Sequence, residues 1–310
     1  MYSFIKELSE IAAVQVSEPM ANHTTLRIGG PADIYTSVSN APVLCLAVRL
    51  AKQYEIPFFV LGAGSNILVR DGGIRGVVIE NKARHLKELE PPSAEEEIIW
   101  RAESGMPLAT LARRSVKQGL SGLEWAVGIP GTIGGAVVSN AGAYGGDVSQ
   151  VVRSVQIVNS HGNIRQLGTQ DLAFGYRESV FSGEARNGNL GTAILIADIV
   201  LKPAAAPDLQ SKVKEMAVLR KQSQPRRPSA GSIFKNPPGF SAGHLIESVG
   251  LKGHRLGDAM FSLEHANFIV NLGAATASEV ESLIRLARGE VRSKFGIDLE
   301  LEIGIVGEEA

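Results

Sequence analysis

The segment Leu61-Gly-Ala-Gly-Ser-Asn66 has the residue types of a loop that holds phosphate groups. Its glycines let backbone N–H groups approach a ligand closely, and Ser65 and Asn66 add side-chain hydrogen-bond partners. The preceding apolar run also fits a dinucleotide-binding fold, but Ile67 replaces the third glycine of that motif, and residues 68–73 turn at once instead of forming a helix. A tight turn without a ligand is a further alternative. The composition favours a phosphate or diphosphate cradle.

Two more glycine-rich segments follow, Gly128–Ala136 and Ser139–Gly146. Of the 34 glycines in the chain, 15 lie between Gly62 and Gly146. Because glycine is costly in regular structure, this clustering indicates turns and close backbone approach to a bound group, although glycine also serves packing. The segments together would suit one elongated ligand with a diphosphate in its middle.

Helices and strands must position these loops, and their periodicity is visible. In the first half we expect a helix over 42–55, strands over 57–61 and 77–79, and a helix whose face carries Leu108, Leu111, Ala112 and Val116. Alternation at 154–157, followed by the turn residues 160–163, predicts a hairpin. The apolar run 193–201 predicts a long strand.

The run Pro203-Ala-Ala-Ala-Pro207 is our expected domain boundary. Asp208 is expected to cap the next helix, whose face carries Leu209, Val213 and Met216. Thr276-Ala-Ser-Glu279 predicts a capping box, with an apolar stripe behind it from Val280 to Val291. The alternating residues 299–305 predict a closing strand. Mixed helix and strand throughout gives an α+β fold class.

Composition excludes several classes of protein. The 310 residues suffice for two or three domains, and 31 basic against 32 acidic side chains provide no global field for nucleic acid or an anionic membrane. No apolar run approaches a spanning length, and the first ten residues lack the apolar stretch of a signal peptide. Cys45 stands alone and the six histidines show no close ligand spacing, so we expect no disulfide framework and no metal site. We expect a soluble, cytoplasmic protein.

Six segments in order give the chain a specific resemblance. They are Gly62-Ala-Gly-Ser-Asn66, Gly122-Leu-Glu-Trp125, Gly128-Ile-Pro-Gly-Thr-Ile-Gly-Gly-Ala136, Asn140-Ala-Gly-Ala-Tyr-Gly145, Gly175-Tyr-Arg177 and Ala230-Gly-Ser-Ile-Phe-Lys-Asn-Pro237. Together they resemble the bacterial UDP-N-acetylenolpyruvoylglucosamine reductase (MurB) family, whose flavin domain belongs to the vanillyl-alcohol-oxidase-like (PCMH) superfamily. The resemblance runs from about Asn22 to Glu302.

The resemblance implies NADPH-dependent, FAD-mediated reduction of UDP-N-acetylglucosamine enolpyruvate to UDP-N-acetylmuramate in peptidoglycan precursor synthesis. It also implies a PCMH-type FAD-binding region in two subdomains, over residues 1–85 and 86–203, followed by an α+β substrate domain over 204–310. Two alternatives stay open: a flavin oxidase of the same superfamily that acts on another small alcohol, and a nucleotide-binding module without catalysis. A catalytic set of Arg177, Ser232 and Glu302 favours the reductase.

Those three residues match the catalytic residues of the family. Arg177 would bind the substrate carboxylate through its planar fork. Ser232 would give the proton to the substrate carbon, with Ser229 as a nearby rival, and needs cations to stabilise its alkoxide. Glu302, distinguished from Glu300 only by the resemblance, would assist at the carboxylate, and a neighbouring carboxylate would raise its pKa.

The remaining site residues follow from the same match. The flavin contacts it implies are Leu61, Gly62, Ala63, Gly64, Ser65, Asn66, Gly128, Ile129, Pro130, Gly131, Thr132, Gly134, Gly135, Ser139, Asn140, Ala141 and Gly142. Lys235 and Asn236 are expected on the substrate side. Tyr144 and Tyr176 are expected either as aromatic walls of the site or as core residues. Arg226 and Arg227 are candidates for the UDP diphosphate or a solvated pair.

The spacing of the catalytic residues places the chain in one class of the family. Only 55 residues separate Arg177 from Ser232 (232 − 177), which is too few for the tyrosine-bearing loop of the longer class. The chain therefore resembles the shorter, loop-lacking class. The resemblance further implies ping-pong turnover, in which NADPH leaves before the sugar enters the same cleft.

Overall fold

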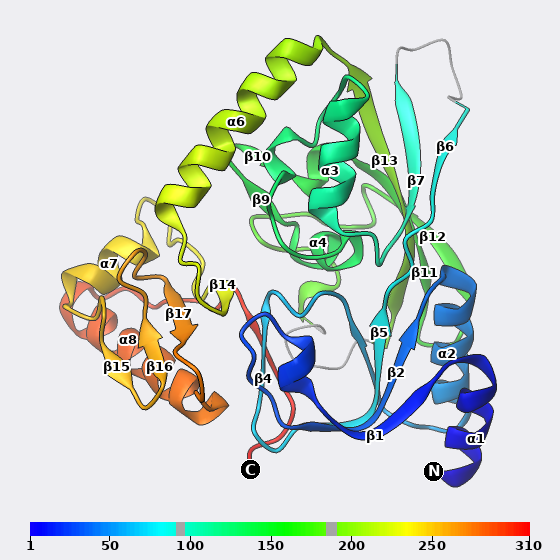
Figure 1. The fold of residues 1–310 in the computed structure, drawn as a ribbon, viewed down its shortest axis with the longest axis horizontal. Helices are drawn as coiled ribbons and strands as arrows, with labels where there is room; N and C mark the ends of the chain where they lie inside the picture. The colour runs from blue at the N-terminus through cyan, green and yellow to red at the C-terminus, as the bar shows by residue number, and fades with distance from the viewer. Residues whose placement is uncertain (91–96, 184–190) are drawn as a thin grey trace.

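Three sheets follow one another along the chain in this computed structural model, which describes residues 1–90, 97–183 and 191–310 (Figure 1). The first sheet has the order β1-β2-β5-β3, with β1 antiparallel to β2 and the other pairs parallel. Its strands are β1 (Val14–Pro19), β2 (Pro31–Val38), β3 (Phe58–Leu61) and β5 (Ile74–Asn81). The expected strands over 57–61 and 77–79 are therefore confirmed.

Helix α2 (Ala41–Gln53) packs against the first sheet and confirms the helix expected over 42–55. It begins where the Asn40 side chain accepts a hydrogen bond from the Val43 N–H, which satisfies one of the free donors of the first turn. Its buried face joins a core shared with α1 (Tyr2–Ile11). The 3₁₀ turn η1 (Met20–His23) follows β1.

The second sheet is six-stranded and built mainly from antiparallel neighbours around the long strand β13 (Ala193–Pro203). The hairpin of β11 (Val152–Val158) and β12 (Ile164–Gly168) is confirmed. The other strands are β6 (Leu86–Leu89), β7 (Ile98–Glu103) and β8 (Leu120–Ser121). Covering elements are α3 (Leu108–Lys117), which confirms the second expected helix, η2 (Glu124–Ala126), α4 (Ile133–Ser139), the pair β9 (Gly142–Ala143) and β10 (Gly146–Asp147), and η3 (Val148–Gln150).

Helix α6 (Ala206–Ser223) runs along the outside of the molecule from the end of β13 to the C-terminal region (Figure 1). The third sheet lies in that region with the order β14-β17-β16-β15. Its strands are β14 (Ser229–Ser232), β15 (Arg255–Leu256), β16 (Ala259–Phe261) and β17 (Phe268–Asn271). Helices α7 (Ala242–Ser248) and α8 (Ala277–Phe295) pack beside it.

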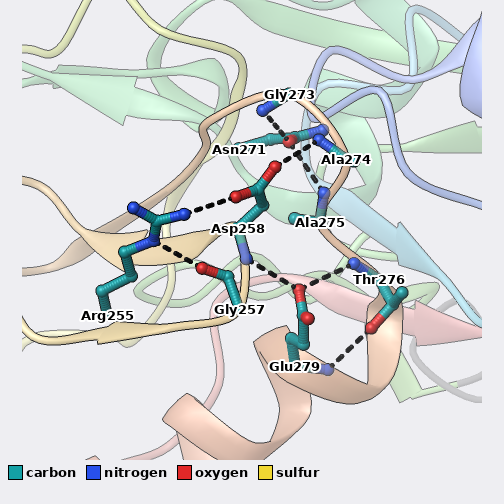
Figure 2. A network of polar contacts seen from close by, with 9 residues as sticks. All are labelled: Arg255, Gly257, Asp258, Asn271, Gly273, Ala274, Ala275, Thr276 and Glu279. Carbon is teal, nitrogen blue, oxygen red and sulfur yellow. Dashed lines mark hydrogen bonds and ion pairs between the residues drawn. The ribbon is translucent and has the colours of Figure 1, made fainter.

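Figure 2 shows the polar network at the start of α8. The capping box is confirmed, since the Thr276 hydroxyl accepts the Glu279 N–H while the Glu279 carboxylate accepts the Thr276 N–H. The same carboxylate accepts the Asp258 N–H, and Asn271 Oδ1 accepts the N–H groups of Gly273 and Ala275. The predicted stripe behind the cap is buried. These bonds fix where α8 begins.

Two local expectations were wrong. Asp208 does not cap α6, because the helix begins two residues earlier, with Ala205 as its N-cap and no side-chain cap bond. The strand over 299–305 is reduced to β18 (Gly304–Val306). Residues 300 and 302 instead bond singly to the irregular segment after β14, through Lys235 N–H to Glu300 O and Glu302 N–H to Ile233 O.

The C-terminal segment of the chain packs against its N-terminal region. Strand β18 pairs in parallel with β4 (Ile67–Val69), directly after the first glycine loop. Val306 is buried with Met20 and Val69 in the core of the first sheet. The three sheets span residues 14–81, 86–203 and 229–271, while the division into domains stays a prediction. Among the described residues, no helix has both the length and the apolar character to cross a bilayer.

Candidate active site

The first two glycine-rich segments meet in space. A Cβ at Gly62 would lie 2.6 Å from Thr132 Oγ1, and a Cβ at Gly131 would lie 3.2 Å from Ser65 Oγ. A side chain at Gly62 would therefore displace the opposite loop. The absence of a Cβ is what lets the two loops line a single groove.

Backbone conformation explains the glycine at Gly64. Its φ is +60°, and a Cβ there would lie 2.2 Å from the carbonyl oxygen of His23. The Thr25 N–H donates to Gly64 O at 3.0 Å, which fixes the loop against the segment after η1. The loop is thus held from behind, and its front is left for a ligand.

A small cavity that is partly open to solvent lies where the loops meet. Its lining includes Gly62, Asn81, Ser104, Thr132, Gly134 and Gly135. The wall combines glycine backbone and short polar side chains with the apolar side chains of Val60, Val138, Phe181 and Ile194, a mixture typical of small-molecule sites. A glycine cradle that a Cβ would fill, beside a cavity with this lining, fits the flavin cofactor expected from the sequence.

Other residues of the predicted flavin set hold the protein together in this structure. Leu61 is in the core, and Ser139 Oγ donates to Gly135 O. Asn140 Nδ2 donates to Gly175 O at 2.8 Å, and Asn66 Nδ2 donates to Glu302 O at 3.1 Å. Their contacts with flavin stay predictions.

Arg177 lies in a loop with a strained backbone. Its φ is +56°, a conformation that costs a non-glycine residue free energy and is concentrated at functional sites. The loop is held by paired hydrogen bonds between Gly175 and Glu178. Arg177 Nη2 donates to Gly142 O at 2.5 Å, so one edge of the guanidinium is fixed to the third glycine-rich segment, Ser139–Gly146.

The guanidinium of Arg177 faces Glu302. Its Nε lies 3.0 Å from Glu302 Oε1, but the N–H does not point at that oxygen, so the buried Nε has no hydrogen-bond partner in the described residues. An unsatisfied buried donor of this kind is costly, and an incoming carboxylate would satisfy it. The geometry therefore fits an arginine that binds an anionic ligand.

Burial raises the pKa of Glu302 above its ordinary value of 4.5. The nearby positive charges of Arg177 and Lys235 oppose this shift without cancelling it. The direction agrees with the expectation from the sequence, but the cause is loss of hydration and not a neighbouring carboxylate. Burial therefore widens the pH range over which Glu302 is protonated and able to donate a hydrogen bond.

Ser232 lies beside this pair. It ends β14 opposite Phe268, and the carbonyl of the next residue, Ile233, accepts the Glu302 N–H at 2.8 Å. Ser229, the rival, sits at the far end of β14 opposite Val270. The structure therefore places the Arg177 side chain against Glu302, and bonds the main chain of Glu302 to the residue that follows Ser232.

Lys235 is buried and paired with two carboxylates. Its Nζ lies 2.6 Å from Glu178 Oε1 and 3.3 Å from Glu300 Oε2. Sequence reasoning missed Glu178, although its position directly after Arg177 in the matched segment was a usable signal. Glu300 and Glu302 differ in exposure, with 70% and 19% of the side chain accessible, which separates two residues that the sequence alone could not.

The remaining predicted residues lie around this centre. Tyr144 and Tyr176 are exposed, so the core alternative is wrong for both. The guanidinium of Arg177 lies 5.5 Å from the centre of the Tyr176 ring. Asn236 Oδ1 accepts the N–H of Ala242, the first residue of α7, whose N-cap is Ser241.

The arginines in and directly after the last turn of α6 differ in their surroundings. Arg226 and Arg227 are exposed, and their role stays open. Arg220, missed in the sequence, packs with its Cδ 3.5 Å from the place where a Cβ of Gly128 would lie. Burial lowers its pKa, and the charge of Tyr144 opposes the shift. No signal in the sequence indicated the packing of Arg220, because α6 has no continuous apolar face and only Leu209 of its residues is buried.

Known proteins agree with this geometry. A family profile described as "FAD binding domain" matches residues 32–168, which include the first two glycine loops. The fold and the site thus define an FAD-binding protein of the oxidoreductase type. A second profile, "UDP-N-acetylenolpyruvoylglucosamine reductase, C-terminal domain", matches residues 223–306, which include Ser232 and Glu302.

Whole-chain relatives identify the family. The UDP-N-acetylenolpyruvoylglucosamine reductase of Geobacillus kaustophilus is 39% identical, over 100% of this chain and 98% of the relative. That of Syntrophus aciditrophicus is 42% identical, over 99% and 97%. The crystal structure of MurB from Thermus caldophilus matches with a TM-score of 0.78 at 35% identity, covering 96% of this chain and 99% of that one. The chain belongs to the UDP-N-acetylenolpyruvoylglucosamine reductase (MurB) family.

Proposed function

We propose that this protein reduces UDP-N-acetylglucosamine enolpyruvate to UDP-N-acetylmuramate, with NADPH as electron donor, in the cytoplasmic synthesis of peptidoglycan precursors. The observation that carries the proposal is the meeting of Arg177, Glu302 and the Ser232 segment at one point. Residues Gly62 and Thr132 and their loops would hold FAD. When bound, FAD supplies a hydride acceptor and donor between the two substrates.

Arg177 and Glu302 serve the carboxylate of the enolpyruvyl group. Hydride addition at the methylene carbon leaves a carbanion conjugated with that carboxylate, so negative charge grows on the carboxylate oxygens. The fixed guanidinium with its unsatisfied Nε, and Glu302 in its protonated form, would act as donors for this charge. Donors that need no reorganisation stabilise the transition state most.

Ser232 completes the reduction. Its hydroxyl proton moves to the carbon next to the carboxylate, and the serine is left as an alkoxide that must regain a proton. The alkoxide needs nearby positive charge, for which Lys235, three residues along the chain, and Arg177, beside Glu302, are the candidates. The overall addition is one hydride and one proton across the double bond.

The exposed rings of Tyr144 and Tyr176 would form aromatic walls of the site. As the family resemblance implies, NADPH would leave before the sugar enters the same cleft. Parallel lines in double-reciprocal plots are the expected result, and intersecting lines would indicate a ternary complex.

Two half-reactions without oxygen test the proposed function. NADPH should bleach the flavin absorbance of the purified holoenzyme, and the UDP-enolpyruvyl sugar should restore it with formation of UDP-N-acetylmuramate. Recovery of absorbance only on admission of air would identify an oxidase instead. Absence of flavin after purification and of flavin binding on addition would exclude both enzymes.

A further inference from the structure

Asn66 ends the first glycine loop, and its hydrogen bonds join that loop to the C-terminal segment. Its side-chain Nδ2 donates to Glu302 O at 3.1 Å, and its own carbonyl accepts the Gly304 N–H at 3.0 Å. The two bonds bracket Ile303, which is fully buried. Asn66 therefore bonds to the main chain on both sides of Ile303, the residue directly after Glu302.

Glu302 is held from the opposite direction as well. Its N–H donates to Ile233 O at 2.8 Å, and its side chain faces Arg177. The peptide groups on both sides of Glu302 are thus fixed, one to the residue after Ser232 and the other to Asn66. The Asn66 bond is the contact that holds the main chain of Glu302 against the predicted flavin loop.

We propose that Asn66 is a positioning residue for the reduction of the sugar, which places Glu302 relative to the flavin loop, and that its side chain is not a flavin contact. This inference rests on the proposed function, because it concerns the step in which Glu302 acts. A donor misplaced by about 1 Å can cost a reaction about a hundredfold in rate. A main-chain hydrogen bond beside the catalytic carboxyl group is the kind of support that prevents such a displacement.

The two half-reactions depend on this support unequally. Flavin reduction by NADPH involves no substrate carboxylate, so it does not need Glu302. Flavin reoxidation by the sugar does need it. Loss of the Asn66 bond should therefore slow one half-reaction and spare the other, whereas loss of a flavin contact would affect flavin binding first.

The test is Asn66→Ala in the FAD-loaded protein, with stopped-flow measurement of each half-reaction without oxygen. We expect the reoxidation rate at saturating sugar to fall about tenfold to a hundredfold. The rate of reduction by NADPH and the flavin dissociation constant, measured by fluorescence, should stay within about twofold. Asn66→Ser keeps a hydrogen-bond donor on a shorter side chain, so it should recover part of the lost reoxidation rate. It replaces the alanine variant in the test if that variant does not fold.

Asn271→Ala is the matched control. Asn271 also donates through Nδ2 to a main-chain oxygen across the same boundary, that of Leu26, but it does not touch Glu302. Its loss should lower thermal stability and leave the ratio of the two half-reaction rates unchanged. A weaker flavin affinity in Asn66→Ala, an equal loss in both half-reactions, or an unchanged reoxidation rate would overturn the inference. Failure of the wild type itself to be reoxidised by the sugar would instead overturn the proposed function.

Discussion

Glu302 shows how a single residue acquires its chemistry from its surroundings. Burial raises the pKa of its carboxyl group, and the neighbouring guanidinium of Arg177 only partly reverses the shift. Because the folded pKa lies above the ordinary 4.5, the protonated form predominates over a wider pH range than in the unfolded chain. The exposed Glu300, two residues away, lacks this environment.

Glu302→Gln tests this assignment. The wild-type reoxidation rate should fall as pH rises through the raised pKa of Glu302, because ionisation removes its hydrogen-bond donor. The glutamine variant is expected to turn over at least about tenfold more slowly, since an amide is a weaker donor than a carboxylic acid, and to lack that alkaline decline. Reoxidation rates across pH 5 to 9 would measure both. Full turnover in a folded, flavin-loaded variant would contradict the assignment.

Ser232 makes a second prediction at this scale. Ser232→Ala should lower the reoxidation rate by about 10²- to 10⁴-fold, the usual contribution of a positioned proton donor, while reduction by NADPH is retained. Ser232→Cys should lose less, because a thiol is more acidic than a hydroxyl. Ser229→Ala is the control, since Ser229 lies at the far end of β14. A larger loss in Ser229→Ala than in Ser232→Ala would move the role to the rival serine.

At the scale of elements, α8 is capped from two directions. Its own Thr276 and Glu279 form the capping box, and Asp71, which follows β4, accepts the N–H groups of Ala277 and Ser278 at 2.9 and 3.0 Å. A carboxylate at a helix N-terminus accepts hydrogen bonds from free N–H groups and interacts favourably with the positive end of the helix dipole. Asp71 therefore links the flavin-loop region to the C-terminal helix.

We expect Asp71→Ala to lower the free energy of unfolding by about 1–2 kcal/mol, as for loss of a helix cap. Urea denaturation of both variants at neutral pH would measure the difference. Asp208→Ala is the matched control, because Asp208 lies in the first turn of α6 without a capping bond. A loss in Asp71→Ala no larger than in Asp208→Ala would show that the bonds to α8 contribute nothing.

The elements also show what the sequence could predict. The capping box of α8 and the hairpin of β11 and β12 depend on neighbours within a few residues, so local patterns sufficed. The strand over 299–305 failed because its partner, the segment after β14, is irregular and distant in sequence. The same distance hid the pairing of Lys235 with Glu178. The resemblance supplied the predicted catalytic residues, but only the fold shows which contacts hold them.

On the scale of the whole molecule, the predicted catalytic residues come from three different regions of the fold. Arg177 comes from the region of the second sheet, Ser232 from the third sheet, and Glu302 from the segment that returns to β4. The pairs Arg177–Glu302 and Lys235–Glu178 cross between these regions, as does the pair Arg70–Glu281 at 2.8 Å. The geometry of the reaction therefore depends on how the C-terminal tail is anchored.

Val306 tests that dependence from a distance. It is buried in the core of the first sheet, far along the chain from the residues it contacts, Met20 and Val69. Val306→Asp would bury a charge without a partner, which should cost about 3 kcal/mol or more of stability. Because β18 and β4 flank the flavin loop and Glu302 together, flavin release and loss of helix signal should share one lowered midpoint in thermal unfolding. Glu308→Gln, at an exposed side chain of the same tail, should change stability by less than about 0.5 kcal/mol. If Val306→Asp kept the wild-type midpoint, the tail would not be the anchor that joins these regions.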